Sequence, residues 1–182
     1  MHVLTHPDHY KTSARLLVLR ARNKDGAGEL RTISRASFSP AEFDQQLGEL
    51  VQLMRTGERI YASTGARDVP KAIRLFKERQ LAAGYDADSE AFYRAIQSRW
   101  LSCLMDPKCQ AEKIWLFDCD SADDAARVSH ELTGLEDLPM PPYKYATKSG
   151  THFVVPAFDK SKLTDHTRAL IHDNALMLWA FS

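Results

Sequence analysis

Apolar and polar positions fall into short blocks along the chain, and the period changes from block to block. In the first half, an apolar run at 16–22 followed by a polar, glycine-containing stretch predicts a strand that turns back in a hairpin. Helical spacing then predicts three helices, one opened by Ser39 and Pro40, one capped by Asp68, and one over about 89–104. A short strand is expected between the first two helices. This half is therefore predicted to be a mixed α/β unit.

The second half is more regular and predicts the order β-α-β-β-α-β, which is that of the ferredoxin-like or RNA-recognition-motif (RRM) fold. Its elements are expected as strand 113–118, helix 122–133, strand 143–147, strand 151–156, a helical stretch near 161–171 and a final strand near 175–181. The predicted fold class is thus α/β of the α+β type. We expect one compact domain over 1–182, with an N-terminal α/β lobe at 1–110 and an RRM-like lobe at 111–182.

Two aspartates one residue apart, Asp118 and Asp120, stand where the strand predicted at 113–118 ends, in KIWLFDCDSADD. On a strand both side chains point to one face, with about 6.6 Å between their Cα atoms. Two carboxylates on one side of a partly buried strand repel, so a proton or a cation is needed between them. Mg²⁺ or Mn²⁺, which prefer oxygen ligands, meet this need. The alternative is a solvated acidic turn that leads into the next helix.

The predicted topology brings three separated segments to one edge of the sheet: the end of the first strand, the turn between the second and third, and the start of the fourth. They contain, in order, Asp118 and Asp120, then KSGTH (148–152), then His172, Asp173 and Asn174. Three carboxylates can hold divalent ions that clamp the oxygens of a phosphoryl transfer. In KSGTH, the glycine permits close backbone approach, and Lys148, Ser149 and His152 supply charge and donors for phosphates.

Composition adjusts this picture. The 182 residues are 44% hydrophobic and 26% charged, which is ordinary for a soluble globular protein. The formal net charge of zero argues against a strongly basic nucleic-acid-binding protein, but basic residues gather between Arg55 and Arg79. This basic cluster, Arg55, Arg59, Arg67, Lys71, Arg74, Lys77 and Arg79, either follows a phosphate backbone or forms the solvated faces of helices.

Cysteine content and hydropathy predict the cellular compartment of the protein. Three cysteines without a CxxC pair predict free thiols, a reducing compartment and no zinc site. No apolar run approaches the length of a membrane helix, and the first residues have no apolar signal-peptide core. We therefore expect a cytoplasmic protein without membrane contact.

Three short segments resemble the motifs of a known family. The hydrophobic DxD of LFDCD, the SGxH of KSGTHFVVP and the hydrophobic-Asp of ALIHD resemble the three motifs of the archaeo-eukaryotic primase superfamily, the catalytic core of primase-polymerases. The resemblance implies a palm-like sheet in the C-terminal half. It also implies that Asp118, Asp120 and Asp173 are catalytic and bind metal, and that Ser149 and His152 bind the nucleotide.

A fourth segment, RIYASTGARD, is similar to an element that precedes the first motif in that family. The similarity gives Arg67 a nucleotide or template role. Capping of the next helix by Asp68 is the competing local explanation. For the whole protein, the resemblance implies a nucleotidyltransferase that uses Mg²⁺ or Mn²⁺ to transfer nucleotides from nucleoside triphosphates onto single-stranded or primed nucleic acid.

Other functions fit the same residues. One alternative is a non-catalytic nucleotide or single-strand binding module that serves a replication or defence partner, in which Tyr143 and Tyr145 stack on bases. Other DxD families fit less well. The position four after Asp118 is Ala122, where a haloacid-dehalogenase phosphatase needs Thr or Val. Asp123 stands where an EF-hand needs glycine.

Overall fold

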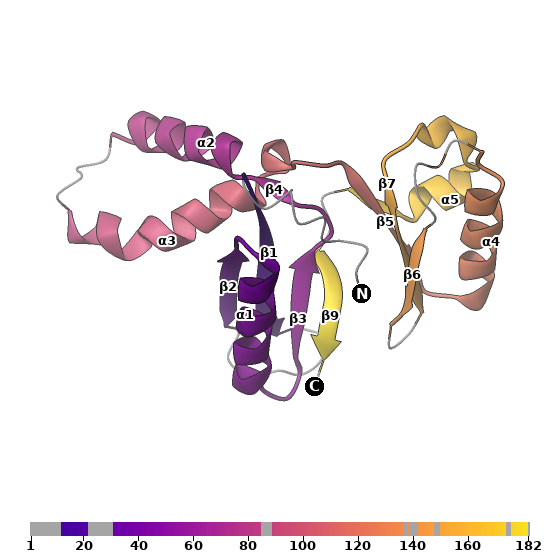
Figure 1. Ribbon diagram of the computed structural model, residues 1–182, viewed down its shortest axis with the longest axis horizontal. Coiled ribbons are helices and arrows are strands. Elements are labelled where there is room, and N and C mark those ends of the chain that lie inside the picture. Colours follow the sequence, from indigo (N-terminus) through magenta and orange to yellow (C-terminus); the bar gives the residue numbers. More distant parts are fainter. Residues whose placement is uncertain are drawn as a thin grey trace.

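The computed structural model describes residues 12–21, 31–84, 89–136, 138, 142–147, 150–173 and 176–181, without the side chains of 173 and 176–181. This part of the chain forms two antiparallel sheets and five α-helices (Figure 1). The predicted α+β class is confirmed. None of the described helices has the length and hydrophobicity needed to cross a membrane.

Most elements lie close to their predicted bounds. The strands are β1 (Ser13–Ala21), β2 (Thr32–Ser37), β3 (Glu58–Ser63), β4 (Arg67–Asp68), β5 (Ile114–Cys119), β6 (Tyr143–Ala146), β7 (Thr151–Pro156), β8 (Ile171–Asp173) and β9 (Leu176–Phe181). The helices are α1 (Pro40–Leu53), α2 (Val69–Ala82), α3 (Glu90–Met105), α4 (Ala122–Thr133) and α5 (Asp165–Ala169). The helix predicted at 122–133 and the strand predicted at 151–156 match to the residue.

Local chemistry explains where the helices begin. The Ser39 hydroxyl accepts a hydrogen bond from the Glu42 amide at 3.1 Å, with Pro40 as the first helical residue of α1. At the start of α2, the Asp68 carboxylate accepts from the Lys71 amide at 2.8 Å. Both caps satisfy an amide that the helix itself leaves without a partner. The capping role of Asp68 is therefore confirmed.

The first sheet has the order β2-β1-β3-β9, and β4 pairs with β1. Helix α1 packs on one face of this sheet, over Leu17 and Leu19, and α2 and α3 pack on the other, over Ala14 and Leu16. The membership of β9 differs from the prediction. The strand expected at 175–181 does not close the C-terminal sheet, because β9 pairs with β3 of the first sheet.

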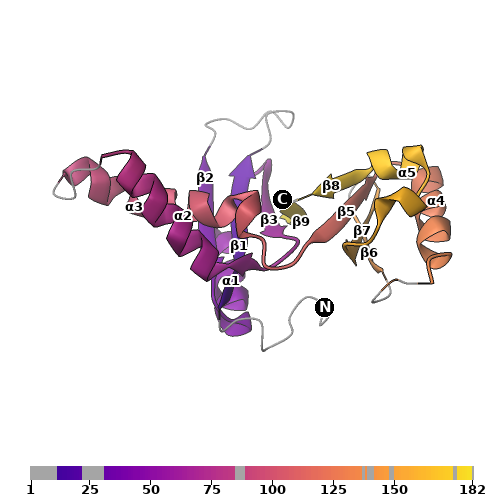
Figure 2. The same cartoon turned by 90° about the horizontal axis from the view of Figure 1, so that it is seen from above.

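The second sheet has the order β6-β7-β5-β8, with antiparallel neighbours. The residues 114–173 have a β-α-β-β-α-β succession, and its elements from β5 to α5 match the predicted ones. Its fourth strand is β8, which was not predicted, and not the strand expected near 175–181. Trp115, Phe117 and Cys119 of β5 pack with α4 residues in the largest core of this half. Figures 1 and 2 both show α4 and α5 on the side of this sheet that is away from the first sheet.

Candidate functional site

Three side chains form a hydrogen-bonded row across the C-terminal sheet. In the strand register, Tyr145 of β6 pairs with His152 of β7, and His152 pairs with Asp118 of β5. His152 Nδ1 lies 2.6 Å from the Tyr145 hydroxyl oxygen, and His152 Nε2 lies 2.8 Å from Asp118 Oδ1. This row, Tyr145–His152–Asp118, joins three strands at one level, close to the end of β5.

Strand alternation decides which face carries the row. Phe117 and Cys119 belong to the core beneath α4, so Leu116 and Asp118 lie on the opposite face. That face is apolar around Leu116 and polar at the row. The Asp118 side chain is 42% exposed, whereas the His152 side chain is 10% exposed. The Asp118 carboxylate is therefore accessible to solvent, whereas the His152 imidazole is mostly buried.

The turn between β6 and β7 lies directly against the end of β5. Thr147 and Gly150 close this turn, with the Thr147 amide donating to the Gly150 carbonyl at 2.9 Å and the Gly150 amide donating to the Thr147 hydroxyl at 3.0 Å. A Cβ atom on Gly150 would collide with the carbonyl oxygen of Cys119 and lie 3.1 Å from the Asp120 Cα. Only glycine allows this approach. The predicted meeting of the SGxH turn with the DxD strand is present at Gly150 and His152.

Burial determines the protonation of two neighbours of the acids. Burial, together with the negative charge of Asp118, raises the pKa of Tyr145 above its ordinary value, so the phenol keeps its proton. Cys119 lies between the two aspartates in the sequence, and its side chain is buried in the core. This burial raises the pKa of the thiol to about 11. The Cys119 thiol is therefore a weak nucleophile, because the thiolate is the reactive form.

Asp173 does not take the predicted position at this edge. In the register it pairs with Trp115, three residues before Asp118 on β5, which corresponds to about 10 Å along the strand. The Asp118 amide instead donates to the Leu170 carbonyl at 3.1 Å. The reason is that β8 begins at Ile171, so Asp173 stands at the far end of that strand. His172, which pairs with Leu116 and is exposed, shares the face of the row.

Three other residues were predicted to contact a nucleotide, and the structure describes one of them. Lys148 and Ser149 lie outside the described residues. Arg67 is only 2% exposed and pairs with Ala14 in the core beneath α2 and α3. Burial lowers its pKa to about 10. A side chain enclosed in this way does not reach a ligand on the surface, so the structure places Arg67 in the core and not at the nucleotide.

The basic cluster does not form one continuous surface. Arg55 and Arg59 lie at the start of β3, whereas the residues from Lys71 onward follow its other end on α2. Lys71 pairs with Asp68, and Arg79 pairs with Asp106. Arg74 and Lys77 are exposed on α2. This distribution resembles the solvated helix faces that the sequence left as an alternative.

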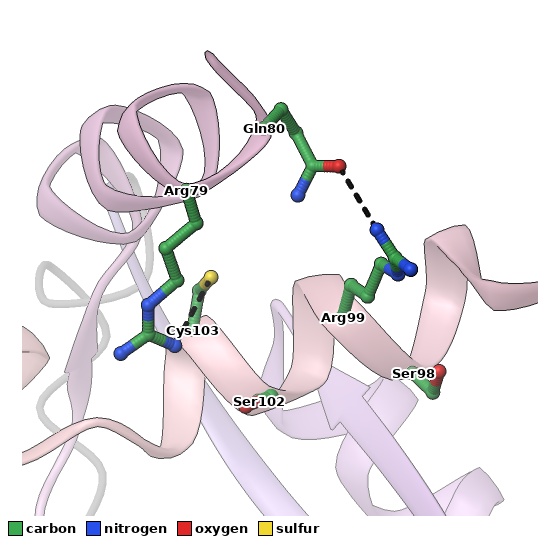
Figure 3. Close-up of a pocket in the computed structure, with 6 residues that line it drawn as sticks. All are labelled: Arg79, Gln80, Ser98, Arg99, Ser102 and Cys103. Atoms are coloured by element: carbon green, nitrogen blue, oxygen red, sulfur yellow. Dashed lines mark hydrogen bonds between the residues drawn. The ribbon is translucent and has the colours of Figure 1, made fainter. Parts of the chain in front are cut away.

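A cavity of about 320 Å³ lies between α2 and α3, which project away from the C-terminal sheet (Figures 1 and 3). Its lining residues are Arg79, Gln80, Ser98, Arg99, Ser102 and Cys103. Arg79 donates to the Cys103 sulfur at 3.7 Å, and Arg99 donates to the Gln80 side chain at 3.5 Å. These contacts hold the two helices together, and the cavity lies apart from the row.

With Asp173 at another position, Asp118 and Asp120 are the predicted metal ligands that remain at the end of β5. Among the described side chains, no group of three His, Cys, Asp or Glu residues is arranged to hold a metal ion. Mg²⁺, however, is usually bound through one or two carboxylates together with waters and substrate phosphates. Asp118 and the exposed Asp120 beside the turn provide such a pair. The residues therefore fit a cation that arrives with a phosphorylated ligand.

Sequence reasoning missed the role of Tyr145 in the row. The signal was the alternation of strands β6 and β7, because residues at matching positions of a hairpin share a face. Comparison of the chain with protein-family models, curated proteins and solved structures finds no match. The function is therefore inferred from the geometry of the site and the motifs of the sequence.

Proposed function

We propose that this protein is a primase-polymerase-type nucleotidyltransferase whose nucleotide site is the polar end of β5. The observation that carries the proposal is the contact between Asp118 and His152, which are 34 residues apart in the sequence and 2.8 Å apart in space. This contact joins the DxD segment to the SGxH segment. Gly150 supports the proposal, because it brings the turn against the backbone between Cys119 and Asp120.

Asp118 and Asp120 would hold Mg²⁺ or Mn²⁺, and the bound cation would supply neutralisation of the charge on the phosphates of a nucleoside triphosphate. His152 donates a hydrogen bond to Asp118 and orients that carboxylate at the site. The 3′-hydroxyl oxygen of a nucleic-acid strand attacks the α-phosphorus, the bond to the β-phosphate breaks, and pyrophosphate leaves. The hydroxyl proton passes to solvent. Two acids rather than three are assigned, because Asp173 lies at the register of Trp115.

The test is primer extension and template-dependent priming with Mg²⁺ or Mn²⁺ and both ribo- and deoxynucleoside triphosphates. Asp118→Asn and Asp120→Asn should each reduce incorporation by at least about 100-fold, since metal stabilisation of phosphoryl transfer is worth several kcal/mol. Asp123→Asn is the matched control, because it removes one exposed acid from the first turn of α4. Equal activity of the three variants would contradict the assignment.

A second function is favoured by a specific observation. His152 already engages Asp118, and the described side chains lack a three-residue metal group. These features suit a non-catalytic module that binds nucleotides or single strands for a replication or defence partner. Triphosphate binding by the wild-type protein, measured by calorimetry, without incorporation on any template would favour this second function.

A further inference from the structure

Tyr145 lies at the end of the row that is farthest from the acids, and neither the motif resemblance nor the proposed reaction gives it a role. Its hydroxyl oxygen is 2.6 Å from His152 Nδ1, and the two rings meet edge to face with their centroids 5.1 Å apart. Both residues occupy paired positions of the β6–β7 hairpin. The contact is thus fixed by the strand register.

The proton positions in the row follow from donor and acceptor chemistry. An ionised carboxylate only accepts hydrogen bonds, so the 2.8 Å contact with Asp118 requires a proton on His152 Nε2. A neutral imidazole carries one N–H, which leaves Nδ1 as an acceptor. The Tyr145 hydroxyl must then be the donor to Nδ1. The order of donation runs from Tyr145 through His152 to Asp118.

We propose that Tyr145 is the positioning residue of this site: by donating to Nδ1 it holds His152 in the orientation and tautomer that present Nε2–H toward Asp118. Without the hydroxyl, the ring can carry its proton on Nδ1, or rotate by half a turn about Cβ–Cγ so that Cε1 replaces Nε2 beside the carboxylate. The Asp118 carboxylate would then lose its hydrogen-bond donor in part of the molecules, and its orientation toward a ligand would vary. This consequence for binding rests on the proposed nucleotide function, whereas the tautomer does not.

The first experiment measures the tautomer directly. Long-range ¹H–¹⁵N spectra of the full chain with labelled histidine are recorded near pH 8, where an ordinary histidine is neutral, and His152→Gln identifies the His152 signals. Wild-type protein should show a protonated Nε2 and an unprotonated Nδ1. Tyr145→Phe should give averaged signals. A proton on Nδ1 in the wild-type protein, or an unchanged fixed pattern in Tyr145→Phe, would overturn the proposal.

The second experiment measures triphosphate affinity with Tyr143→Phe as the matched control. Tyr143 lies on the same face of β6, where it packs with Leu116 and Val154, and is not part of the row. Tyr145→Phe should weaken binding by about three- to ten-fold, the effect of one lost hydrogen bond, while Tyr143→Phe keeps wild-type affinity. Equal affinities would overturn the positioning role. If the wild-type protein binds no triphosphate, the nucleotide function fails, and the spectra still decide the role of Tyr145.

Discussion

Two histidine–aspartate pairs among the described residues of the C-terminal half have nearly the same separation and different surroundings. His152 and Asp118 are 2.8 Å apart, and His166 and Asp124 are 2.7 Å apart. The His152 side chain is 10% exposed and lies in a strand, whereas the His166 side chain is 51% exposed and lies in α5. The distance alone therefore does not distinguish the two pairs.

The surroundings of the second pair indicate a structural role. Asp124 also accepts a hydrogen bond from the Ser121 hydroxyl at 2.7 Å, and that hydroxyl accepts from the Asp124 amide. Asp124 thus belongs to the cap of α4, and His166 ties α5 to that cap. In the first pair, the carboxylate stands at an open sheet face beside a glycine turn. The two pairs thus differ in their further partners: the Tyr145 hydroxyl and an exposed carboxylate in the first pair, and the α4 cap in the second.

The largest effect is expected from Gly150→Ala, which adds a methyl group where the turn meets Cys119. The β6–β7 turn must shift, at a cost of about 3 kcal/mol in the free energy of unfolding, and the row should lose its geometry. Gly134→Ala is the control, because its added Cβ lies 3.5 Å or more from other atoms. Denaturant titration measures both. Similar stabilities would mean that the turn does not lie against β5 as described.

Replacing each of the two histidines separately should give an effect on unfolding free energy smaller than that of Gly150→Ala. His152→Ala deletes a buried ring with two hydrogen bonds, and we expect a loss of about 2 kcal/mol in unfolding free energy. His166→Ala removes a contact at a half-exposed side chain, so its effect on the unfolding free energy should be the smaller of the two. Triphosphate binding should fall only for His152→Ala. If His166→Ala lost as much triphosphate affinity as His152→Ala, both histidine–aspartate pairs would belong to one binding site.

The smallest effect concerns acid pH and the second pair. Hydrogen bonds from Ser121 and then from His166 lower the pKa of Asp124 below its ordinary value. A carboxyl whose pKa is lower in the folded state contributes stability above the unfolded value of about 3.9, and this stability is lost as pH falls through the folded value. Asp124→Asn should therefore flatten the decrease of unfolding free energy between pH 5 and pH 3. Asp123→Asn, at the neighbouring position, is the control. If the two variants show the same dependence of unfolding free energy on pH, the contact of Asp124 with Ser121 and His166 does not stabilise the folded protein.

Local patterns predicted much of the fold because their causes are local. Helix starts at Ser39 and Asp68 follow from side chains that accept amide hydrogen bonds, and these caps form as expected. Periodicity alone was less informative for α2, where Ala72 is buried while Ile73 and Leu81 are exposed. A short helix presents several overlapping apolar stripes, and only the partner surface selects among them.

The sequence by itself determined the α+β class, the order of elements from β5 to α5, and the approach of Gly150 and His152 to the DxD strand. The tertiary structure decided that β9 joins the first sheet, that Asp173 pairs with Trp115, and that Arg67 is enclosed in the core. Alternation along a strand specifies which residues share a face. It does not specify the partner strand or the register, because those depend on contacts between segments far apart in the chain.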